Sequence, residues 1–340
     1  MATVQVARKG VLPRPVSIQG RVHACIMGIT MRVSVVVVNW NVRELLQRCL
    51  ASVLKESGSF PAGSVEIIVV DNASSDGSAE MVREQYPQVR LLANADNRGF
   101  SAACNQALAG CTGDAVLLLN PDAELLPGSL GELAGWLERH PEAAAVGPRM
   151  LNADGTIQSS RRRFPTLATA FLESTILQSY LPKLPHLSRY YCLDQPEDHE
   201  QEVDWLVGAC LLLRRKALQE VGPFDERFFL YFEETDWCLR AKRADWRIGY
   251  LPHAQVMHHY GQSSGQDLRL RHIYFTDSKC RYYRKHFGPA AGRLVRWFLL
   301  VSYALQMVEE SIKLALGHKG AMRRQRIALL GSVLKWGLKG

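Results

Sequence analysis

The sequence lacks the glycine-rich loops with which many nucleotide-binding enzymes hold phosphates. Neither a G-x-G-x-x-G fingerprint nor a P-loop follows the first apolar run, "VSVVVVN". The backbone amides of such loops bind the phosphates of a dinucleotide or a triphosphate. Their absence argues against a dinucleotide-dependent dehydrogenase and against an ATPase.

Paired cysteines and long apolar runs are also absent. Eight cysteines are scattered singly, with no Cys-x-x-Cys pair, which predicts a reducing cytosol with neither a zinc site nor a disulfide framework. No apolar run is long enough to span a bilayer. Residues 1–31 contain no continuous apolar segment of the kind found in a secretory signal peptide. We expect these residues to form a disordered arm, or Met31 to be the true start.

Basic residues are scarce in the body of the chain and frequent at its ends. The net charge of the whole chain is +8, but residues 33–278 hold 23 basic against 31 acidic residues, a local charge of −8. Residues 279–339 hold 13 basic residues against two acidic ones. A nucleic-acid groove needs basic residues in the body, so this balance argues against it. An acidic core with basic ends fits an enzyme held electrostatically at an anionic surface.

Short β-branched runs alternate with amphipathic segments from Arg32 onward. The run "VSVVVVN" precedes a helical apolar pattern, and "VEIIVVDNASSDGS", "VRLLANADNRGF", "AVLLLNPDAEL" and "AAAVGPRML" continue the alternation. Strands that alternate with helices over short links predict a parallel sheet with right-handed crossovers. The expected fold is α/β with a mainly parallel central sheet, in a catalytic domain spanning residues 32–280.

The C-terminal residues 281–340 predict a basic, amphipathic helical tail. Apolar side chains recur there at alternating four- and three-residue spacing, the pattern of one helical stripe: Leu294, Phe298, Val301, Leu305, Val308, Ile312 and Ala315. Two readings remain open. The tail lies on an anionic membrane surface, or its stripe packs against the body or against a second subunit in a homo-oligomer.

Each predicted strand stops at an asparagine or an aspartate, and four such ends carry Asn39, Asp71 with Asn72, Asn94 to Asn97, and Asn120 with Asp122. A single residue of this kind is explained by the preference of asparagine and aspartate for tight turns and helix caps. Four at the carboxyl ends of neighbouring strands favour a ligand site, because ligands of open α/β sheets bind at that edge. Asp122, held by Pro121, supplies a carboxylate oxygen of the kind that Mg²⁺ and Mn²⁺ prefer.

An ordered set of motifs is far more specific than any one of them. It comprises "VVVVNWN", "VVDNASSDGS", "NRGFSAACNQAL", "LLLNPDAEL", "GPFDERFFLYFEETDWCLR" and "HHYGQSS". In this order the motifs resemble the inverting family 2 glycosyltransferases, and within them the bacterial rhamnosyltransferase-type members. The resemblance spans about Val33 to Ser264 and implies a nucleotide-sugar-binding fold of the A type.

The resemblance also implies residue roles on the donor side. Asp71 resembles the carboxylate that contacts the nucleotide base, near Asn39, and Arg98 and Asn105 resemble further nucleotide contacts. Asn120 occupies the first position of the family's D-x-D motif and belongs to the donor-binding set.

Asp122 resembles the metal-binding aspartate of that motif, and His258 resembles a histidine near the diphosphate and the metal. Because Asn120 replaces an aspartate, the cation would have one carboxylate fewer.

The segment "FEETDWCLR" resembles the family's catalytic Glu-Asp-x-Asp motif. Glu234 then stands at the position of the catalytic base, and Asp236 completes the catalytic pair. Crowded acids beside aromatic rings are expected to have at least one raised carboxyl pKa. Acids stabilised by a helix N-terminus, and an ion pair of Asp236 with Arg240 one turn later, are the structural alternatives.

Together these features predict an inverting, metal-assisted glycosyltransferase that uses Mg²⁺ or Mn²⁺. The resemblance implies dTDP-rhamnose as the donor, with a UDP-sugar as the alternative. It implies a saccharide or lipid-linked acceptor at the cytoplasmic face of the cell membrane, in cell-envelope polysaccharide synthesis. A sugar nucleotidyltransferase and a non-catalytic, membrane-associated nucleotide-sugar-binding protein are the rival functions.

Overall fold

A computed structural model describes residues 30–180, 184–259 and 265–339. Its centre is a ten-stranded sheet whose main path runs β3-β2-β1-β4-β11-β6-β12-β5, with β7 paired to β6 and β9 paired to β12. A separate two-stranded sheet joins β10 and β8. The strands are β1 Val33–Asn39, β2 Val65–Asp71, β3 Arg90–Ala93, β4 Ala115–Leu119, β5 Ala123–Leu125, β6 Ala143–Leu151, β7 Ile157–Gln158, β8 Arg161–Arg162, β9 Gln201–Glu202, β10 Trp205–Leu206, β11 Cys210–Arg214 and β12 Arg247–His258.

The first half of the sheet follows from the sequence pattern. Strands β1 and β4 are apolar along nearly their whole length, and almost every residue in them is buried, as expected for strands covered on both faces. Strand β1 pairs in parallel with β2 and with β4, and β2 pairs in parallel with β3. Their carboxyl ends therefore meet at one edge.

The second half departs from a purely parallel sheet. Strand β11 enters between β4 and β6 and runs antiparallel to both. Strand β6 therefore runs in the same direction as β4, and β12 is parallel to β6. In the ten-stranded sheet of the described chain, β1, β2, β3, β4, β6 and β12 run one way and β5, β7, β9 and β11 the other. The prediction of a mainly parallel α/β sheet is confirmed.

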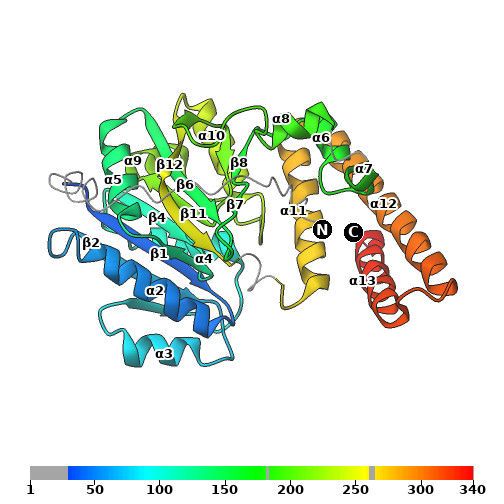
Figure 1. Ribbon diagram of the computed structural model, residues 1–340, viewed down its shortest axis with the longest axis horizontal. Helices are drawn as coiled ribbons and strands as arrows, with labels where there is room; N and C mark the ends of the chain where they lie inside the picture. Colours follow the sequence, from blue (N-terminus) through cyan, green and yellow to red (C-terminus); the bar gives the residue numbers. More distant parts are fainter. Residues whose placement is uncertain (1–29, 181–183, 260–264, 340) are drawn as a thin grey trace.

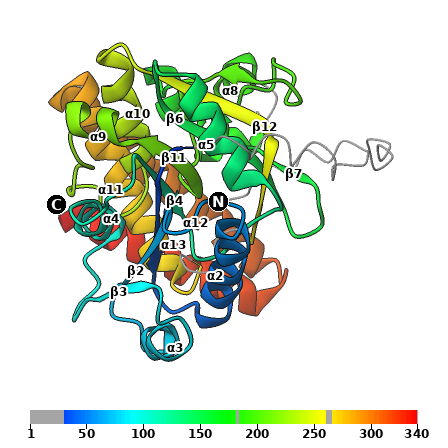
Figure 2. The same cartoon turned by 90° about the vertical axis from the view of Figure 1, so that its left-hand side faces the viewer.

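Helices cover both faces of this sheet (Figure 2). One apolar cluster joins the sheet to α2 and α5 through residues such as Leu50 and Leu133. The opposite cluster joins it to α4, α9 and α10 through residues such as Ala103, Ala217 and Trp237. The helices are α2 Arg43–Ser57, α3 Ser78–Gln85, α4 Phe100–Leu108, α5 Ser129–Arg139, α6 Leu167–Leu172, α7 Ile176–Tyr180, α8 Pro185–Tyr190, α9 Arg215–Val221, α10 Glu233–Arg243, α11 Leu268–Phe287, α12 Pro289–Ala315 and α13 Gly320–Lys339.

The tail is helical, as predicted, and its first helix begins before residue 281. Helices α11, α12 and α13 lie to one side of the sheet (Figure 1). They share a third apolar cluster with Ala170 of α6 and with Phe228 and Phe232, which precede α10. No helix among the described residues has a stretch long and apolar enough to cross a membrane. Residues 1–29, nearly all of the predicted N-terminal arm, lie outside the described residues.

Candidate active site

The ends of β1 and β2 bring Asn39 and Asp71 side by side. The two residues are register partners, and Asn39 Nδ2 donates a hydrogen bond to Asp71 Oδ1 at 2.8 Å. The second oxygen of Asp71 accepts a bond from the Ser74 backbone at 2.9 Å. Both side chains are buried, and Asn39 Oδ1 accepts no hydrogen bond from the described residues. A buried acceptor without a donor costs free energy, so this atom is suited to a ligand N–H or O–H group.

The next strand end extends this polar edge. Asn94 Nδ2 donates to Asn72 Oδ1 at 2.9 Å, and Asn72 Nδ2 donates to the Gly99 carbonyl at 3.1 Å. Arg98 lies beside Gly99 with its side chain exposed. Asn39 and Asp71 therefore lie at the ends of the adjacent parallel strands β1 and β2, and Arg98 lies in the segment between β3 and α4. Their contacts with a nucleotide stay a prediction.

Asn105 occupies a different environment on α4. Its Nδ2 donates to the Phe224 carbonyl and to Glu226 Oε1, both at 2.9 Å, and its Oδ1 accepts from the Phe224 backbone at 3.0 Å. It also lines a cavity of about 270 Å³ together with Arg215. The amide of Asn105 is therefore committed to the segment that precedes α10, and its nucleotide contact stays a prediction.

The turn after β4 places Asp122 against the end of β12. Strands β5 and β12 pair Ala123 with His258, and Asp122 Oδ1 lies 3.3 Å from His258 Nε2. Both side chains are 4% exposed. The other ring nitrogen of His258, Nδ1, lies 2.7 Å from Gln158 Oε1. The neighbouring His259 contacts Glu124 instead, with Nε2 and Oε1 2.8 Å apart.

This donor set fits a hard divalent cation that also binds substrate phosphate. With Gln158 accepting a hydrogen bond from Nδ1, the Nε2 atom of a neutral His258 presents its lone pair toward the Asp122 carboxylate. Two acceptors facing each other are stabilised by a cation, either a proton or a metal. The described residues contain no cluster of three or more metal-ligating side chains. The remaining ligands would have to come from substrate and water, as is usual for Mg²⁺.

Glu234 reaches the same edge of the sheet through a short chain of backbone contacts. Gly208 N donates to Glu234 Oε1 at 3.3 Å, and the next residue, Ala209, accepts a bond from Asn120 N at 2.9 Å through its carbonyl. Asn120 is two residues from Asp122. These bonds hold the acid of α10 beside the turn that carries the candidate metal ligand.

The start of α10 is strained and acidic. Tyr231 and Phe232 both have left-handed backbones, with φ of 71° and 68°, a conformation that costs a non-glycine residue of order 1 kcal/mol. Glu233 and Glu234 follow this turn in the first turn of α10. The Oε2 atoms of both acids are buried and accept no hydrogen bond from the described residues.

Burial sets the acidity of these two groups. It raises the pKa of the Glu233 carboxyl well above its usual range, and the adjacent Glu234 carboxylate raises it further. Burial also raises the pKa of Glu234, opposed by backbone N–H groups that include Gly208 and by the charge of Arg162. The prediction of a raised carboxyl pKa in this cluster is confirmed in direction. Glu234 is thus a stronger base than an exposed glutamate.

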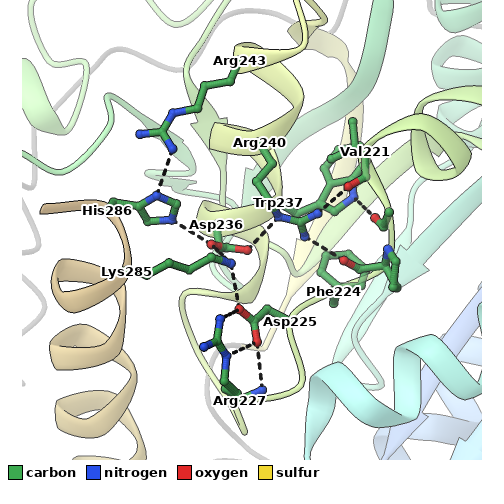
Figure 3. Close-up of polar contacts among 12 residues, drawn as sticks. Val221, Phe224, Asp225, Arg227, Asp236, Trp237, Arg240, Arg243, Lys285 and His286 are labelled. Carbon is green, nitrogen blue, oxygen red and sulfur yellow. Dashed lines mark hydrogen bonds and ion pairs between the residues drawn. The ribbon is translucent and has the colours of Figure 1, made fainter. Parts of the chain in front are cut away.

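Asp236 lies in an ion-pair network (Figure 3). Its side chain is fully buried and contacts Arg240 Nε at 3.0 Å, Lys285 Nζ at 2.6 Å and His286 Nε2 at 2.8 Å. Despite burial, which acts to raise it, the pKa of Asp236 is lowered, chiefly by His286 and Lys285. The predicted ion pair with Arg240 is present, and Asp236 ties α10 to α11. A catalytic role for Asp236 stays a prediction.

Sequence reasoning did not identify Gly208 and Gln158, which hold Glu234 and His258 in place. Both act through contacts between segments far apart in the chain, and neither lies in a motif with a distinctive spacing. A side chain at Gly208 would have its Cβ 3.4 to 3.5 Å from Glu234. No local signal in the sequence marks these roles.

Comparison with known proteins shows the family to which the chain belongs. The model of "Glycosyl transferase family 2" matches residues 34–222, more than half of the chain. The chain therefore belongs to glycosyl transferase family 2, and it is a glycosyltransferase.

Its relatives include rhamnosyltransferases. The chain is 34% identical over 301 residues to the N-acetylglucosaminyl-diphospho-decaprenol L-rhamnosyltransferase of Mycobacterium tuberculosis, covering 82% of this chain and 94% of the relative. It is 29% identical over 147 residues to the rhamnosyltransferase WbbL of Escherichia coli K12, covering 43% and 52%. The chain thus resembles the rhamnosyltransferase members of its family.

The fold also has a solved counterpart. A mannosyltransferase from Pyrobaculum calidifontis, in complex with GDP-Man and Mn²⁺, matches with a TM-score of 0.52 and 19% identity. The match covers 91% of this chain and 86% of that one. This likeness supports the A-type glycosyltransferase fold.

Proposed function

We propose that this protein transfers L-rhamnose from dTDP-rhamnose to a lipid-linked saccharide acceptor, with inversion, in the synthesis of a cell-envelope glycan. The relative from Mycobacterium tuberculosis, which aligns over most of both chains, supports the sugar and the class of acceptor. A UDP-sugar is the alternative donor. The proposed location is the cytoplasmic face of the cell membrane, where a lipid-linked acceptor would be reached.

The observation that carries the chemistry is the convergence of Asp122, His258 and Glu234 at one edge of the sheet. The hydrogen bonds of Gly208 with Glu234 and of Ala209 with Asn120 support this proposal, because they link the proposed base to the turn that carries the candidate metal ligand. Asn39 and Asp71 lie on the adjacent strand ends and would hold the nucleotide base. Arg98 and Asn120 would complete the donor side, and the part played by Asn105 remains a prediction.

The reaction is a single displacement. The oxygen of the acceptor hydroxyl bonds to the anomeric carbon, the bond from that carbon to the diphosphate breaks, and Glu234 takes the hydroxyl proton. A raised carboxyl pKa makes Glu234 a better proton acceptor, because a base works best when its pKa lies near the working pH. A bound Mg²⁺ or Mn²⁺, held by Asp122 and His258, would offset the negative charge that develops on the departing diphosphate.

The test is transfer by the purified protein from dTDP-rhamnose to a synthetic N-acetylglucosaminyl-diphospho-lipid, with mass spectrometry of the product and NMR of the new anomeric centre. A product of inverted configuration supports the proposal. UDP- and GDP-sugars serve as competing donors. Transfer from one of these but not from dTDP-rhamnose would overturn the donor assignment.

The family match favours transfer over the two rival functions. A nucleotidyltransferase would release pyrophosphate from a nucleoside triphosphate, and a binding protein would hold the donor without turnover. Both outcomes are read in the same assay.

A further inference from the structure

Helix α12 carries an apolar stripe that nothing in the described residues covers. Seven large apolar side chains at three- and four-residue spacing are each more than half exposed: Leu294, Trp297, Val301, Leu305, Val308, Ile312 and Leu316, the last just beyond the helix end. At 1.5 Å per residue such a stripe is about 33 Å long. A contiguous apolar surface of this kind marks an interaction site.

The exposed stripe is not needed to hold the helix on the protein. The opposite side of α12 is buried in the third apolar cluster through Val295, Leu299 and Tyr303. Gly337 of α13 lies against Leu300, where a Cβ would come within 2.2 Å of the leucine side chain. The helix is therefore apolar on two faces, only one of which packs against its neighbours.

The hairpin formed by α12 and α13, residues 289–339, is strongly basic. It contains nine Lys or Arg residues against Glu309 and Glu310, a net charge of +7. Lys313 pairs with Glu309, and Arg323 and Arg326 pair with Glu310. Five exposed cations of the hairpin form no ion pair with any acid of the described residues: Arg293, Lys319, Arg324, Lys335 and Lys339.

This combination favours one kind of partner. A second copy of the hairpin would bring two charges of +7 together, and residues 1–29 of the chain add four more cations and no acid. In both cases the like charges would repel each other, which argues against a second copy and against residues 1–29 as the partner of the stripe. An anionic bilayer offers acyl chains to the stripe and negative headgroups to the cations, and an exposed tryptophan such as Trp297 suits its interface.

We propose that the α12–α13 hairpin docks on an anionic lipid bilayer, with α12 lying in the plane of the interface and its stripe facing the acyl chains. The proposal deepens the proposed function, because it brings the active site to the surface that holds a lipid-linked acceptor. Figure 1 shows the hairpin at the side of the molecule away from α2 and α3, where it can meet a surface without covering them.

The experiment is flotation of the full chain with two kinds of vesicle that contain neither donor nor acceptor. One kind is phosphatidylcholine alone, and the other also contains phosphatidylglycerol. We expect binding to the anionic vesicles only, weakened by high salt because the attraction is partly electrostatic. The double variant Leu305→Glu/Val308→Glu should bind at least tenfold more weakly. Leu193→Glu, which alters a leucine of equal exposure outside the hairpin, should bind like the wild type.

A second variant tests the charge independently. Arg324→Gln/Lys335→Gln/Lys339→Gln removes three exposed cations and should weaken binding about a hundredfold, since each cation near an anionic surface contributes about fivefold. Its apolar stripe is intact, so a folding defect of the first variant would not remove the test. Equal vesicle binding by the wild type and both variants would overturn the proposal.

Light scattering without vesicles gives the other decisive outcome. A wild-type dimer that becomes a monomer in Leu305→Glu/Val308→Glu, with no vesicle binding, would assign the stripe to a second copy and overturn the proposal. Transfer to a short-chain, water-soluble acceptor should be unchanged in both variants. Failure of docking is thereby separated from failure of the proposed sugar transfer.

Discussion

His258 Nε2 lies 3.3 Å from Asp122 Oδ1, because the antiparallel pairing of β5 and β12 sets Ala123 opposite His258. Two segments far apart in the chain thus supply a carboxylate and an imidazole to one buried point. Gln158, from a third segment, fixes the ring through Nδ1. The affinity of the candidate metal site should therefore depend on Gln158, which orients His258.

Replacing Gln158 with methionine should weaken Mn²⁺ binding in the presence of dTDP by about tenfold to a hundredfold, the usual effect of losing a group that orients a ligating histidine. The reason is that His258 loses the acceptor that fixes its ring and tautomer. The change in free Mn²⁺ is measured by electron paramagnetic resonance. Gln47→Met, on the surface of α2, is the matched control and should leave the affinity unaltered. An unchanged affinity in Gln158→Met would remove His258 from the metal site.

Glu234 and Glu233 are adjacent acids with different expected roles. Glu234→Gln should lower kcat by about a hundredfold to ten-thousandfold, the usual contribution of a general base, while donor binding is retained. Glu233→Gln should keep kcat within about threefold at neutral pH, because Glu233 is not the proposed base and burial raises the pKa of its carboxyl, which favours the neutral form that the amide resembles. Steady-state kinetics of the two variants compare them directly. Equal losses in both would contradict the assignment of the base.

The same burial predicts a pH dependence of stability. A carboxyl whose pKa is raised in the folded state binds more protons folded than unfolded, so stability falls as pH rises from the unfolded value near 4.5 through the folded pKa. Glu233→Gln removes this cost and should be more stable than the wild type at pH 8, by at most about 1.4 kcal/mol for each pH unit between the two pKa values. Urea unfolding at pH 5 and pH 8 measures the difference. If the difference in unfolding free energy between Glu233→Gln and the wild type is no larger at pH 8 than at pH 5, the predicted pH dependence is wrong.

Asp236 should matter for stability through its link between α10 and α11. Asp236→Asn leaves Arg240, Lys285 and His286 without their buried carboxylate and should cost about 3 kcal/mol at pH 7. Because the pKa of Asp236 is lowered in the folded protein, the stabilisation is present above its unfolded value near 3.8 and is lost as pH falls through the folded pKa.

Urea unfolding of the variant and the wild type checks this cost. Asp277→Asn breaks an exposed pair with Arg281 at the same four-residue spacing on α11, and should cost no more than about 0.5 kcal/mol. Similar costs for the two variants would show that the buried network adds nothing beyond an ordinary surface pair.

The sequence allowed the parallel half of the fold and its polar edge to be predicted. The β-branched run of β1 and the Asn and Asp residues at the strand ends are local signals, and periodicity with turn chemistry is enough to interpret them. Insertion of β11 between β4 and β6 left no such signal, because strand order is decided by packing between distant segments. For the same reason Gly208 and Gln158 could not be assigned.

Residue roles in the acidic cluster were harder to predict than its position. The motif placed Glu234 and Asp236 together as catalytic, but side chains on the same helix turn point in different directions. In the structure Glu234 turns toward Gly208 and Asp236 toward Lys285 and His286. The tail stripe was predicted by its spacing, although Phe298 packs against Phe171, and Trp297 stands among the exposed residues in its place.

The proposed mechanism requires Asp71, Asp122 and Glu234 to surround one donor site. A crystal structure of the protein with dTDP and Mn²⁺ tests it most directly. We expect the base beside Asn39 and Asp71, the metal at Asp122 and His258, and the diphosphate between them on the side facing Glu234. Nucleotide density in the cavity beside Asn105 and Arg215, with none along these strand ends, would contradict the account.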